Sequence, residues 1–397
     1  MRVRKNVKNL TNSEKTAFVS AVLALKQQPG SLRPEIAGWS RYDDYAEVHM
    51  NSMMVVPGWA HRGPAFFPWH RELLLRFEND LVAIDPSVTI PYWDWPDPGS
   101  SPFTADLLGP DGDPASAGKV TSGPFAFDGP NQWKILSKDD PGDPDYLARS
   151  FGTDPTAMQL PTVSDVATSL NAVPYDSYPW TGATAGFRTS VESNLHNVVH
   201  RYISGTMGLM TSPNDPVFWL HHCNIDRLWA HWPTIHPASS PYLPVSGAAL
   251  GHNLNDAMIF NDMGPQPWPV GATPASVIDH YLLGYRYDDE ILFEKPRIPM
   301  SFVRVLFGVI NDAPGVVIGA DGKPHPVPGW PPDAWAVLRE PERNELVGAA
   351  IQQMAELMPD RLAAREIRAL IGKAVGARAV KATVSDEFLE SVTGERR

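Results

Sequence analysis

The chain has 397 residues, 43% of them hydrophobic, with 13 tryptophans and a formal charge of −12. This is enough for one large domain with an appendage, and the charge argues against nucleic acid or anionic membranes as partners. No apolar run approaches the roughly 18 residues of a membrane span. The single cysteine, Cys223, excludes an intramolecular disulfide. The basic N-terminus is followed by no apolar signal segment, so we expect a cytoplasmic protein, with partner-assisted export as the alternative.

Apolar residues at helical spacing predict helices over 11–25, 42–54, 70–84, 187–203 and 216–232. The first begins with TNSE, which resembles a capping box.

The remaining segments are less regular. Proline, glycine, aspartate and serine dominate 96–186, which indicates long loops. Strand-like runs occur near 278–310, and 341–375 is expected to be helical. The sequence therefore predicts a mainly α protein with long loops and a few short strands.

Histidines gather in two groups along the chain. In HNVVH the spacing of four places His196 and His200 on one helix face. No cysteine or carboxylate is interleaved at ligand spacing, and an all-nitrogen site of low charge suits copper or zinc. The groups are His49, His61 and His70, and then His196, His200, His221 and His222.

Two histidine-containing segments occur in this order along the chain, HRGPAFFPWHRELLLRFE (61–78) and DPVFWLHHCNID (215–226), and HNVVH lies between them. They resemble the two copper-site signatures of the tyrosinase, catechol oxidase and haemocyanin family, with bacterial tyrosinases most similar. The resemblance covers about 1–300. It implies an antiparallel four-helix bundle that holds a dinuclear type 3 copper site, followed by a C-terminal extension over 301–397.

The resemblance also implies which histidines bind which ion. His221 and His222 are adjacent and point about 100° apart on a helix, and the signature favours His222 as the ligand. His221 is then a packing or supporting residue, and Asp226 a carboxylate that orients the site. The implied ligands are His49, His61 and His70 for copper A, and His196, His200 and His222 for copper B.

Members of the family use O2 to oxidise o-diphenols to o-quinones, and some first hydroxylate monophenols. A phenol has a pKa near 10 and must lose its proton before it binds copper. In the family a glutamate and an asparagine hold a water for this step, and Glu192 and Asn197 resemble them. The gap between Glu192 and His196 is shorter than in close relatives.

Other positions are expected to shape the substrate pocket. Phe218 would pack against a ligand ring, and Met210 would favour aromatic rings. Arg201 could attract a substrate carboxylate or pair with a local acid.

Residues 301–397 are a candidate lid, because GWPPDAW offers Trp330 and Trp335 for insertion into the site, as do Phe302 and Phe307. A packing or dimerisation segment is the alternative. The resemblance further suggests a phenolic small-molecule substrate and a copper-delivery partner.

Three other functions remain open at this point. One is a catechol or o-aminophenol oxidase without monophenolase activity. Another is an oxygen carrier resembling haemocyanin. A zinc hydrolase built on HNVVH is disfavoured, since that motif lacks a catalytic glutamate.

Overall fold

The computed structural model describes residues 1–54, 58–237, 239–260 and 271–290, together with two short strands at 316–318 and 324–326. The chain divides into two units, Met1–Glu290 and Ile291–Arg397. All residues predicted to form the metal site lie in the first unit. No helix within the described residues is both long and apolar enough to cross a membrane.

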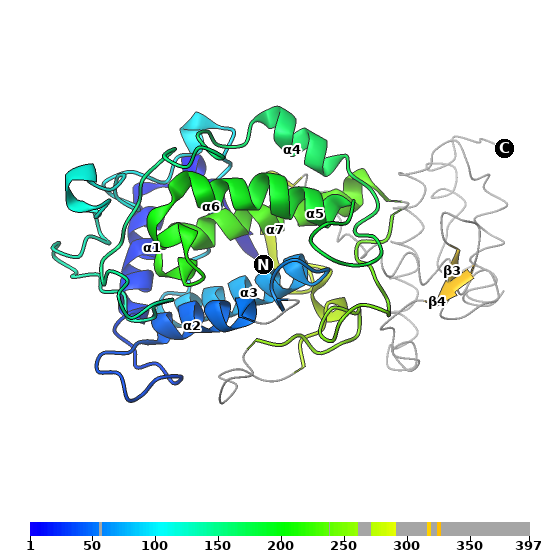
Figure 1. The fold of residues 1–397 in the computed structure, drawn as a ribbon, viewed down its shortest axis with the longest axis horizontal. Helices are drawn as coiled ribbons and strands as arrows, with labels where there is room; N and C mark the ends of the chain where they lie inside the picture. Colours follow the sequence, from blue (N-terminus) through cyan, green and yellow to red (C-terminus); the bar gives the residue numbers. More distant parts are fainter. Residues whose placement is uncertain (55–57, 238, 261–270, 291–315, 319–323, 327–397) are drawn as a thin grey trace, which may run out of the picture. The chain divides into compact units, whose positions relative to one another are not determined.

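The first unit is mainly helical, which confirms the predicted class (Figure 1). Short 3-10 turns punctuate the loops. Strand β1 pairs in parallel with β2, with Arg2 opposite Tyr285, and in the second unit β3 pairs antiparallel with β4. The elements are β1 (Arg2–Arg4), α1 (Asn12–Leu25), α2 (Arg41–Met53), α3 (Phe66–Ile84), α4 (Val163–Leu170), α5 (Phe187–Val191), α6 (Asn197–Ile203), α7 (Val217–Ile235), β2 (Tyr285–Tyr287), β3 (Val316–Ile318) and β4 (Pro324–Pro326).

Local sequence explains where the first helices begin. At α1 the Thr11 side chain accepts from the Glu14 N–H while Glu14 accepts from the Thr11 N–H, which is the predicted capping box. Ser40 and Asp43 form the same arrangement at the start of α2. Such caps satisfy backbone donors that have no partner within the helix.

Two helices are longer than predicted. Helix α3 begins at Phe66 rather than at His70, because Pro68 lies in its first turn, where a missing N–H costs no hydrogen bond. Helix α7 continues past Trp232 to Ile235, with Pro233 in its last turn.

The loop predicted over 96–186 contains one α-helix, α4, which begins with a capping box formed by Thr162 and Asp165, and the composition did not reveal it. Within the predicted strand region 278–310, the structure has β2, and 291–310 lies outside the described residues. The helix predicted over 341–375 and the aromatic residues Phe302, Phe307, Trp330 and Trp335 also lie outside them.

Helices α3 and α7 pack through an aromatic core. The Phe77 and Trp219 rings stack at 3.6 Å, and Tyr45 of α2 meets both rings edge-on. Each such pair contributes about 0.5–1.5 kcal/mol beyond the burial of its area. This core fixes α2, α3 and α7 against one another, and these helices carry His49, His70, His221 and His222 of the site.

Candidate metal centre

The structure brings both predicted histidine groups together from elements far apart in sequence. Helix α2 carries His49, the following loop carries His61, and α3 carries His70. The ligand nitrogens of these three lie within 4.8 Å of one another, and so do those of the second group. In the second group His196 ends a π turn between α5 and α6, His200 lies on α6, and His221 and His222 lie on α7.

Backbone carbonyls fix the protonation of the first group. His49 Nδ1 lies 2.6 Å from the Met210 carbonyl oxygen, and His70 Nδ1 lies 2.7 Å from that of Phe66. A carbonyl oxygen only accepts, so each Nδ1 carries the proton and each Nε2 presents a lone pair. Both Nε2 atoms are buried without a hydrogen-bond partner in the described part of the chain, as is Nδ1 of His61.

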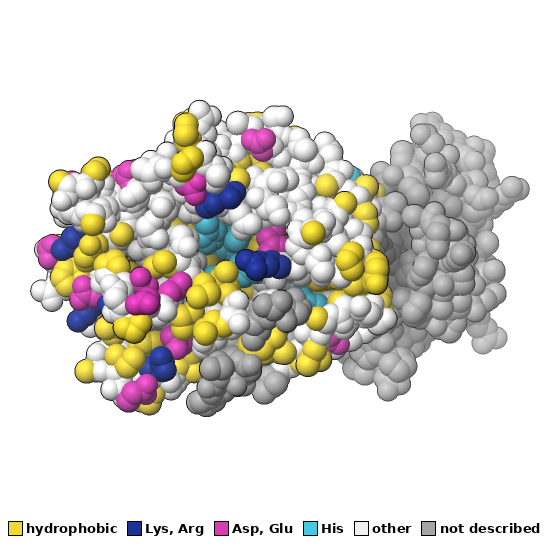
Figure 2. Space-filling model, viewed as in Figure 1, with side chains coloured by type: hydrophobic (Ala, Val, Ile, Leu, Met, Phe, Trp, Pro, Cys, Tyr) yellow, Lys and Arg dark blue, Asp and Glu magenta, His cyan; other side chains and the backbone are white. Residues whose placement is uncertain are grey.

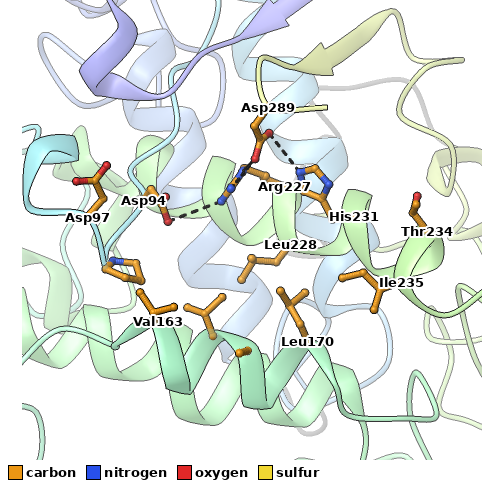
Figure 3. Close-up of a pocket in the computed structure, with 13 residues that line it drawn as sticks. Asp94, Asp97, Val163, Leu170, Arg227, Leu228, His231, Thr234, Ile235 and Asp289 are labelled. Carbon is orange, nitrogen blue, oxygen red and sulfur yellow. Dashed lines mark hydrogen bonds and ion pairs between the residues drawn. The ribbon is translucent and has the colours of Figure 1, made fainter. Parts of the chain in front are cut away.

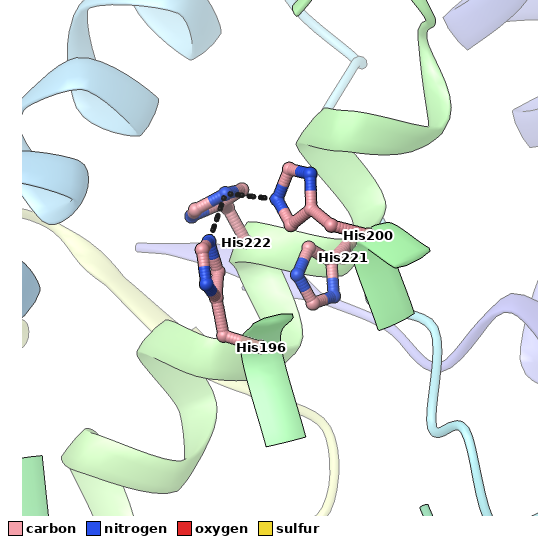
Figure 4. Close-up of side chains that lie close together, drawn as sticks. All are labelled: His196, His200, His221 and His222. Carbon is pink, nitrogen blue, oxygen red and sulfur yellow. Dashed lines mark hydrogen bonds between the residues drawn. The ribbon is translucent and has the colours of Figure 1, made fainter. Parts of the chain in front are cut away.

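In the second group, shown in Figure 4, two histidines likewise have Nδ1 bonded to an oxygen acceptor. His200 Nδ1 donates to the Met207 carbonyl at 2.7 Å, and His196 Nδ1 donates to Asn197 Oδ1 at 2.8 Å. The freed Nε2 atoms of His196 and His200 lie 3.3 Å and 3.5 Å from His222 Nε2. His222 Nε2 is therefore within hydrogen-bond distance of both atoms, and in the metal-free chain a proton on it can bond to one of them. A metal ion bound by the three nitrogens would take the place of that proton.

The spacing fits one metal ion. Imidazole nitrogens bind first-row ions such as zinc at about 2.0–2.1 Å, which places two ligands of one ion roughly 3.3–3.6 Å apart. Ligand histidines generally donate their other ring N–H to a carbonyl or carboxylate, as His49, His70 and His200 do here. The donor set is therefore suited to a first-row metal.

Burial keeps these imidazoles neutral. It lowers the pKa of His49 to about 3 and that of His200 to about 4. Burial and the neighbouring imidazoles also hold the pKa values of the other five well below the usual range. Neutral imidazole is the form that binds metals, so the site is ready for an ion at neutral pH.

The two groups form a single centre. The His70 and His222 rings stack at 4.2 Å, and the His61 and His196 rings lie 5.5 Å apart. Phe218 packs at the junction, with its ring 4.0 Å from that of His222 and 5.0 Å from that of His49. Two ions held by the two groups would therefore face each other across a short gap.

His221 lies closer to the group than its helix register suggested. Its ring stacks 5.2 Å from the His196 ring and lies 5.2 Å from the Trp95 ring. The side chain is fully buried, and neither of its nitrogens has a hydrogen-bond partner among the described residues. A ring nitrogen of His221 also lies within 4.8 Å of those of the other three, but the closest printed contacts of His196 Nε2 and His200 Nε2, at 3.3 Å and 3.5 Å, are with His222 Nε2.

Glu192 and Asn197 are brought onto one side of the helix by the π turn. The Asn197 N–H bonds to the Glu192 carbonyl, five residues back. In an α-helix residues five apart point about 140° apart, whereas the wider π turn brings them nearly above one another.

The Glu192 carboxylate is already held by two donors. Its Oε1 accepts from the Arg62 N–H at 2.6 Å, and its Oε2 accepts from Arg188 at 2.9 Å. Burial raises its pKa and outweighs the opposing effect of Arg188. Arg188 also pairs with Asp176, so this network ties the His61 loop to the helix that carries His196.

Asp226 was predicted to orient the site as a carboxylate behind the ligands, and the structure shows which groups it bonds. Its carboxylate accepts from Arg4, Arg71, Tyr285 and Tyr287, and from no histidine in the described ranges. The residue instead joins the N-terminal strand, α3, α7 and β2. Next to this cluster lies Cys223, whose thiol is free and fully buried.

Several supporting contacts escaped the sequence analysis. Met210 acts through its backbone: its carbonyl accepts from His49, and its N–H donates to Asp139 at 2.6 Å. His252 is buried and accepts from the Ala65 N–H at 3.2 Å, which steadies the loop that carries His61. Such contacts link residues more than 70 positions apart, and no local pattern announces them.

Figure 2 shows histidine atoms exposed in a shallow depression, with basic and acidic side chains at its edge. His200 is the partly exposed member of the site, and Arg201, the next residue, is exposed. Another cavity, of about 460 Å³, lies between α4 and α7 (Figure 3). Its one histidine, His231, bonds to Asp289, and none of the predicted site residues line it.

The helices bring together seven neutral histidines, and all of them except the partly exposed His200 are buried. Such an arrangement is typical of proteins that bind metal ions through histidine. Residues 39–235 match the family described as the common central domain of tyrosinase. Tyrosinases from Streptomyces glaucescens and Streptomyces antibioticus are 41% and 40% identical over 292 residues, which cover 70% of this chain and 97% of each relative.

Grixazone synthase from Streptomyces griseus is 35% identical and covers 72% of the chain and 99% of its own length. A solved mutant of the polyphenol oxidase of Thermothelomyces thermophila shares the fold, with a TM-score of 0.54 at 24% identity over 72% of this chain and 88% of that one.

The chain belongs to the tyrosinase family of type 3 copper oxidases and is an enzyme of the tyrosinase and polyphenol oxidase kind. The Streptomyces tyrosinases share more of its sequence than the tyrosinase of the frog Pelophylax lessonae, which is 27% identical.

Proposed function

We propose that this protein uses O2 to o-hydroxylate monophenols and to oxidise o-diphenols to o-quinones. Two copper ions would be bound, one by His49, His61 and His70 and the other by His196, His200 and His222. The helices that carry these ligands, α2, α3, the α5–α6 run and α7, would form the antiparallel four-helix bundle of the family.

One observation carries the proposal. Four histidines of the two groups have Nδ1 bonded to an oxygen acceptor, which leaves their Nε2 lone pairs aimed into one buried centre. Without an ion, a proton on His222 Nε2 can satisfy only one of the lone pairs of His196 and His200, and those of His49 and His70 have no hydrogen-bond partner among the described residues. Neutral imidazoles without thiolate or carboxylate suit copper, and the relatives are tyrosinases.

A bound copper pair would supply electron exchange between the phenolic ring and O2. For o-diphenols, two substrates give two o-quinones, and one O2 becomes two waters. The chain's own contribution is orientation and exclusion of water. Phe218 is fully buried against the rings of His222 and His49, so it would hold ligand rings of both groups in place.

Hydroxylation additionally requires removal of the phenol proton. Glu192 and Asn197 lie one π turn apart beside His196, and the Asn197 amide nitrogen remains available because only its oxygen bonds His196. Together they would hold a water that takes the proton. A carboxylate with a raised pKa is a better base for a phenol with pKa near 10.

A second candidate is oxidation of o-diphenols or o-aminophenols without hydroxylation. This candidate is favoured because two donors, the Arg62 N–H and the Arg188 side chain, already bond to the Glu192 carboxylate. These bonds reduce the capacity of Glu192 to hold a water.

Oxygen consumption by the copper-loaded protein, with a monophenol and its matching o-diphenol side by side, separates these functions. Uptake with both supports the proposal, and uptake with the diphenol alone supports the second candidate. No uptake with either would leave the oxygen carrier and would contradict both. The product of monophenol hydroxylation is itself an o-diphenol substrate. The monophenol assay therefore contains ascorbate, which reduces the o-quinone back to the diphenol, and the lag phase of its progress curve is analysed.

A further inference from the structure

We propose that the cavity between α4 and α7 is a second small-molecule site, outside the histidine centre, and that it binds monocationic amines with an apolar body. The cavity has a volume of about 460 Å³, and the described residues that line it include none of the histidines of the metal centre (Figure 3). Ligand pockets generally enclose about 300–1,000 Å³, and an apolar cavity of about 150 Å³ already holds benzene. The space is therefore sufficient for one ring with a short side chain.

Two helices supply the apolar walls of this cavity. Helix α7 contributes Leu228 and Ile235, and the facing residues of α4 follow the i, i+3, i+4, i+7 spacing of one helix face, namely Val163, Val166, Ala167 and Leu170. Val163 is 71% exposed and Ile235 is 45% exposed, so the described part of the chain leaves much of these walls open to solvent. An apolar ligand that packs against them would remove this surface from water.

Charged groups lie along the edge of the same cavity, and two of its three carboxylates are engaged by cations. Asp289 accepts from Arg227 Nε at 2.8 Å, and its other oxygen lies 3.2 Å from His231 Nε2. Asp97 accepts from Lys8 Nζ at 2.6 Å and also from the Gly99 N–H. Neither carboxylate is therefore free for a ligand. The titratable residues that line the cavity are Asp94, Asp97, Arg227, His231 and Asp289.

Asp94 is the third carboxylate, and it is the one that remains available. Its ion pair with Arg227 is long, at 3.7 Å, and its side chain accepts no hydrogen bond from the residues that the structure describes. Arg227 is itself held by Asp289 and donates to Asn224 at 3.0 Å, so it is a poor donor for an anion. The formal charge of −12 on the chain also favours a cation.

An amine with an apolar body matches both features of the cavity. Its ammonium group has three N–H donors, which Asp94 can accept, while its ring or chain packs against α4 and α7. The Asp94 side chain is 28% exposed, so water weakens the charge pair. Exposed pairs of this kind give a preference of up to about fivefold over a neutral molecule of the same shape.

The test is calorimetric titration of the copper-loaded full chain with 2-phenylethylamine and with 2-phenylethanol, at pH 7. We expect the amine to bind up to about fivefold more tightly than the alcohol. In Asp94→Asn the two affinities should become equal. The matched control is Asp145→Asn, because Asp145 forms a similarly long ion pair, at 3.8 Å from Lys134, and this variant should keep the wild-type preference.

A second variant locates the binding site. Ala167 is exposed on α4, so Ala167→Trp should fill the cavity without disturbing the core, which an unchanged melting temperature and o-diphenol turnover would verify. Both ligands should then bind at least tenfold more weakly. Equal affinities for amine and alcohol in the wild type, or amine binding that survives in Ala167→Trp, would overturn the inference. Because 2-phenylethylamine has no phenolic hydroxyl and binding is measured without turnover, these outcomes are independent of the proposed oxidation.

Discussion

Single backbone oxygens prepare the ligands of this site. The carbonyls of Phe66, Met207 and Met210 each hold one histidine in the tautomer whose Nε2 is free. For His196 the acceptor is a side chain, Asn197 Oδ1, so this residue has two tasks. Its oxygen orients a ligand, and its nitrogen is available to hold a water.

The two tasks of Asn197 can be separated by substitution. Asn197→Asp keeps an oxygen acceptor for His196 but removes the amide donor. We expect monophenol kcat to fall about 10- to 100-fold, while diphenol kcat changes less than about threefold, because only the monophenol requires the extra proton transfer. Initial rates at saturating copper check this. Equal losses with both substrates would reject the water-holding role.

Asp226 shows how a residue near the site can serve stability instead. Burial alone would raise its pKa, but Arg71, Arg4 and the hydroxyls of Tyr285 and Tyr287 together hold it below the usual range. A carboxyl with a depressed pKa stabilises the fold above its unfolded pKa of about 3.9, and that contribution is lost as the pH falls through the lower folded value.

Asp226→Ala should therefore lower the free energy of unfolding at pH 7 by roughly 3–5 kcal/mol, because it leaves the buried Arg71 guanidinium without a carboxylate and Arg4 with Glu78 alone. The difference in the free energy of unfolding between wild type and variant should become smaller below about pH 4. Urea unfolding of the copper-free proteins between pH 7 and pH 3 measures both effects. The exposed Asp145→Ala serves as control, and a gap that stays constant with pH would contradict the assignment.

At the scale of elements, the sequence predicts what depends on local pattern. The helices α1, α2, α3 and α7 follow from periodicity and capping, and the histidine groups from motif spacing. The π turn between Glu192 and His196 does not follow from the local pattern, which predicts one continuous α-helix over 187–203. The partners of Asp226 were equally hidden, since Arg4 lies 222 positions away in the chain.

The loop over 58–65, which carries His61, is held between Glu192 and His252. A Cβ on Gly63 would lie 2.6 Å from His252 Cε1, so Gly63→Ala must displace the histidine or the loop. We expect the chelator concentration that removes one of the two copper ions to be about 10- to 100-fold lower for Gly63→Ala than for the wild type.

Copper analysis after graded dialysis against the chelator measures this change. Gly142→Ala is the matched control, because only the Asp140 side chain lies within 4 Å of its added Cβ. The same chelator dependence in both variants would show that His252 does not position the loop.

At the scale of the whole molecule, the Streptomyces tyrosinases cover 70% of this chain with 97% of their own length. A chain that ends at Arg297 therefore contains about as much sequence as these relatives and should fold and bind copper. If residues 301–397 act as a lid, its diphenol turnover should exceed that of the full chain. Oxygen uptake and the melting temperature test this together, and unchanged turnover in a folded truncated protein would reject the lid.

The central claim is that three histidines of each group bind one copper ion and that His222, not its neighbour His221, is a ligand. Metal analysis of the purified, copper-loaded chain tests it directly. The wild type should hold two copper ions per chain, His221→Asn should also hold two, and His222→Asn should hold one. A single ion in the wild type, or loss of an ion from His221→Asn but not from His222→Asn, would contradict the assignment.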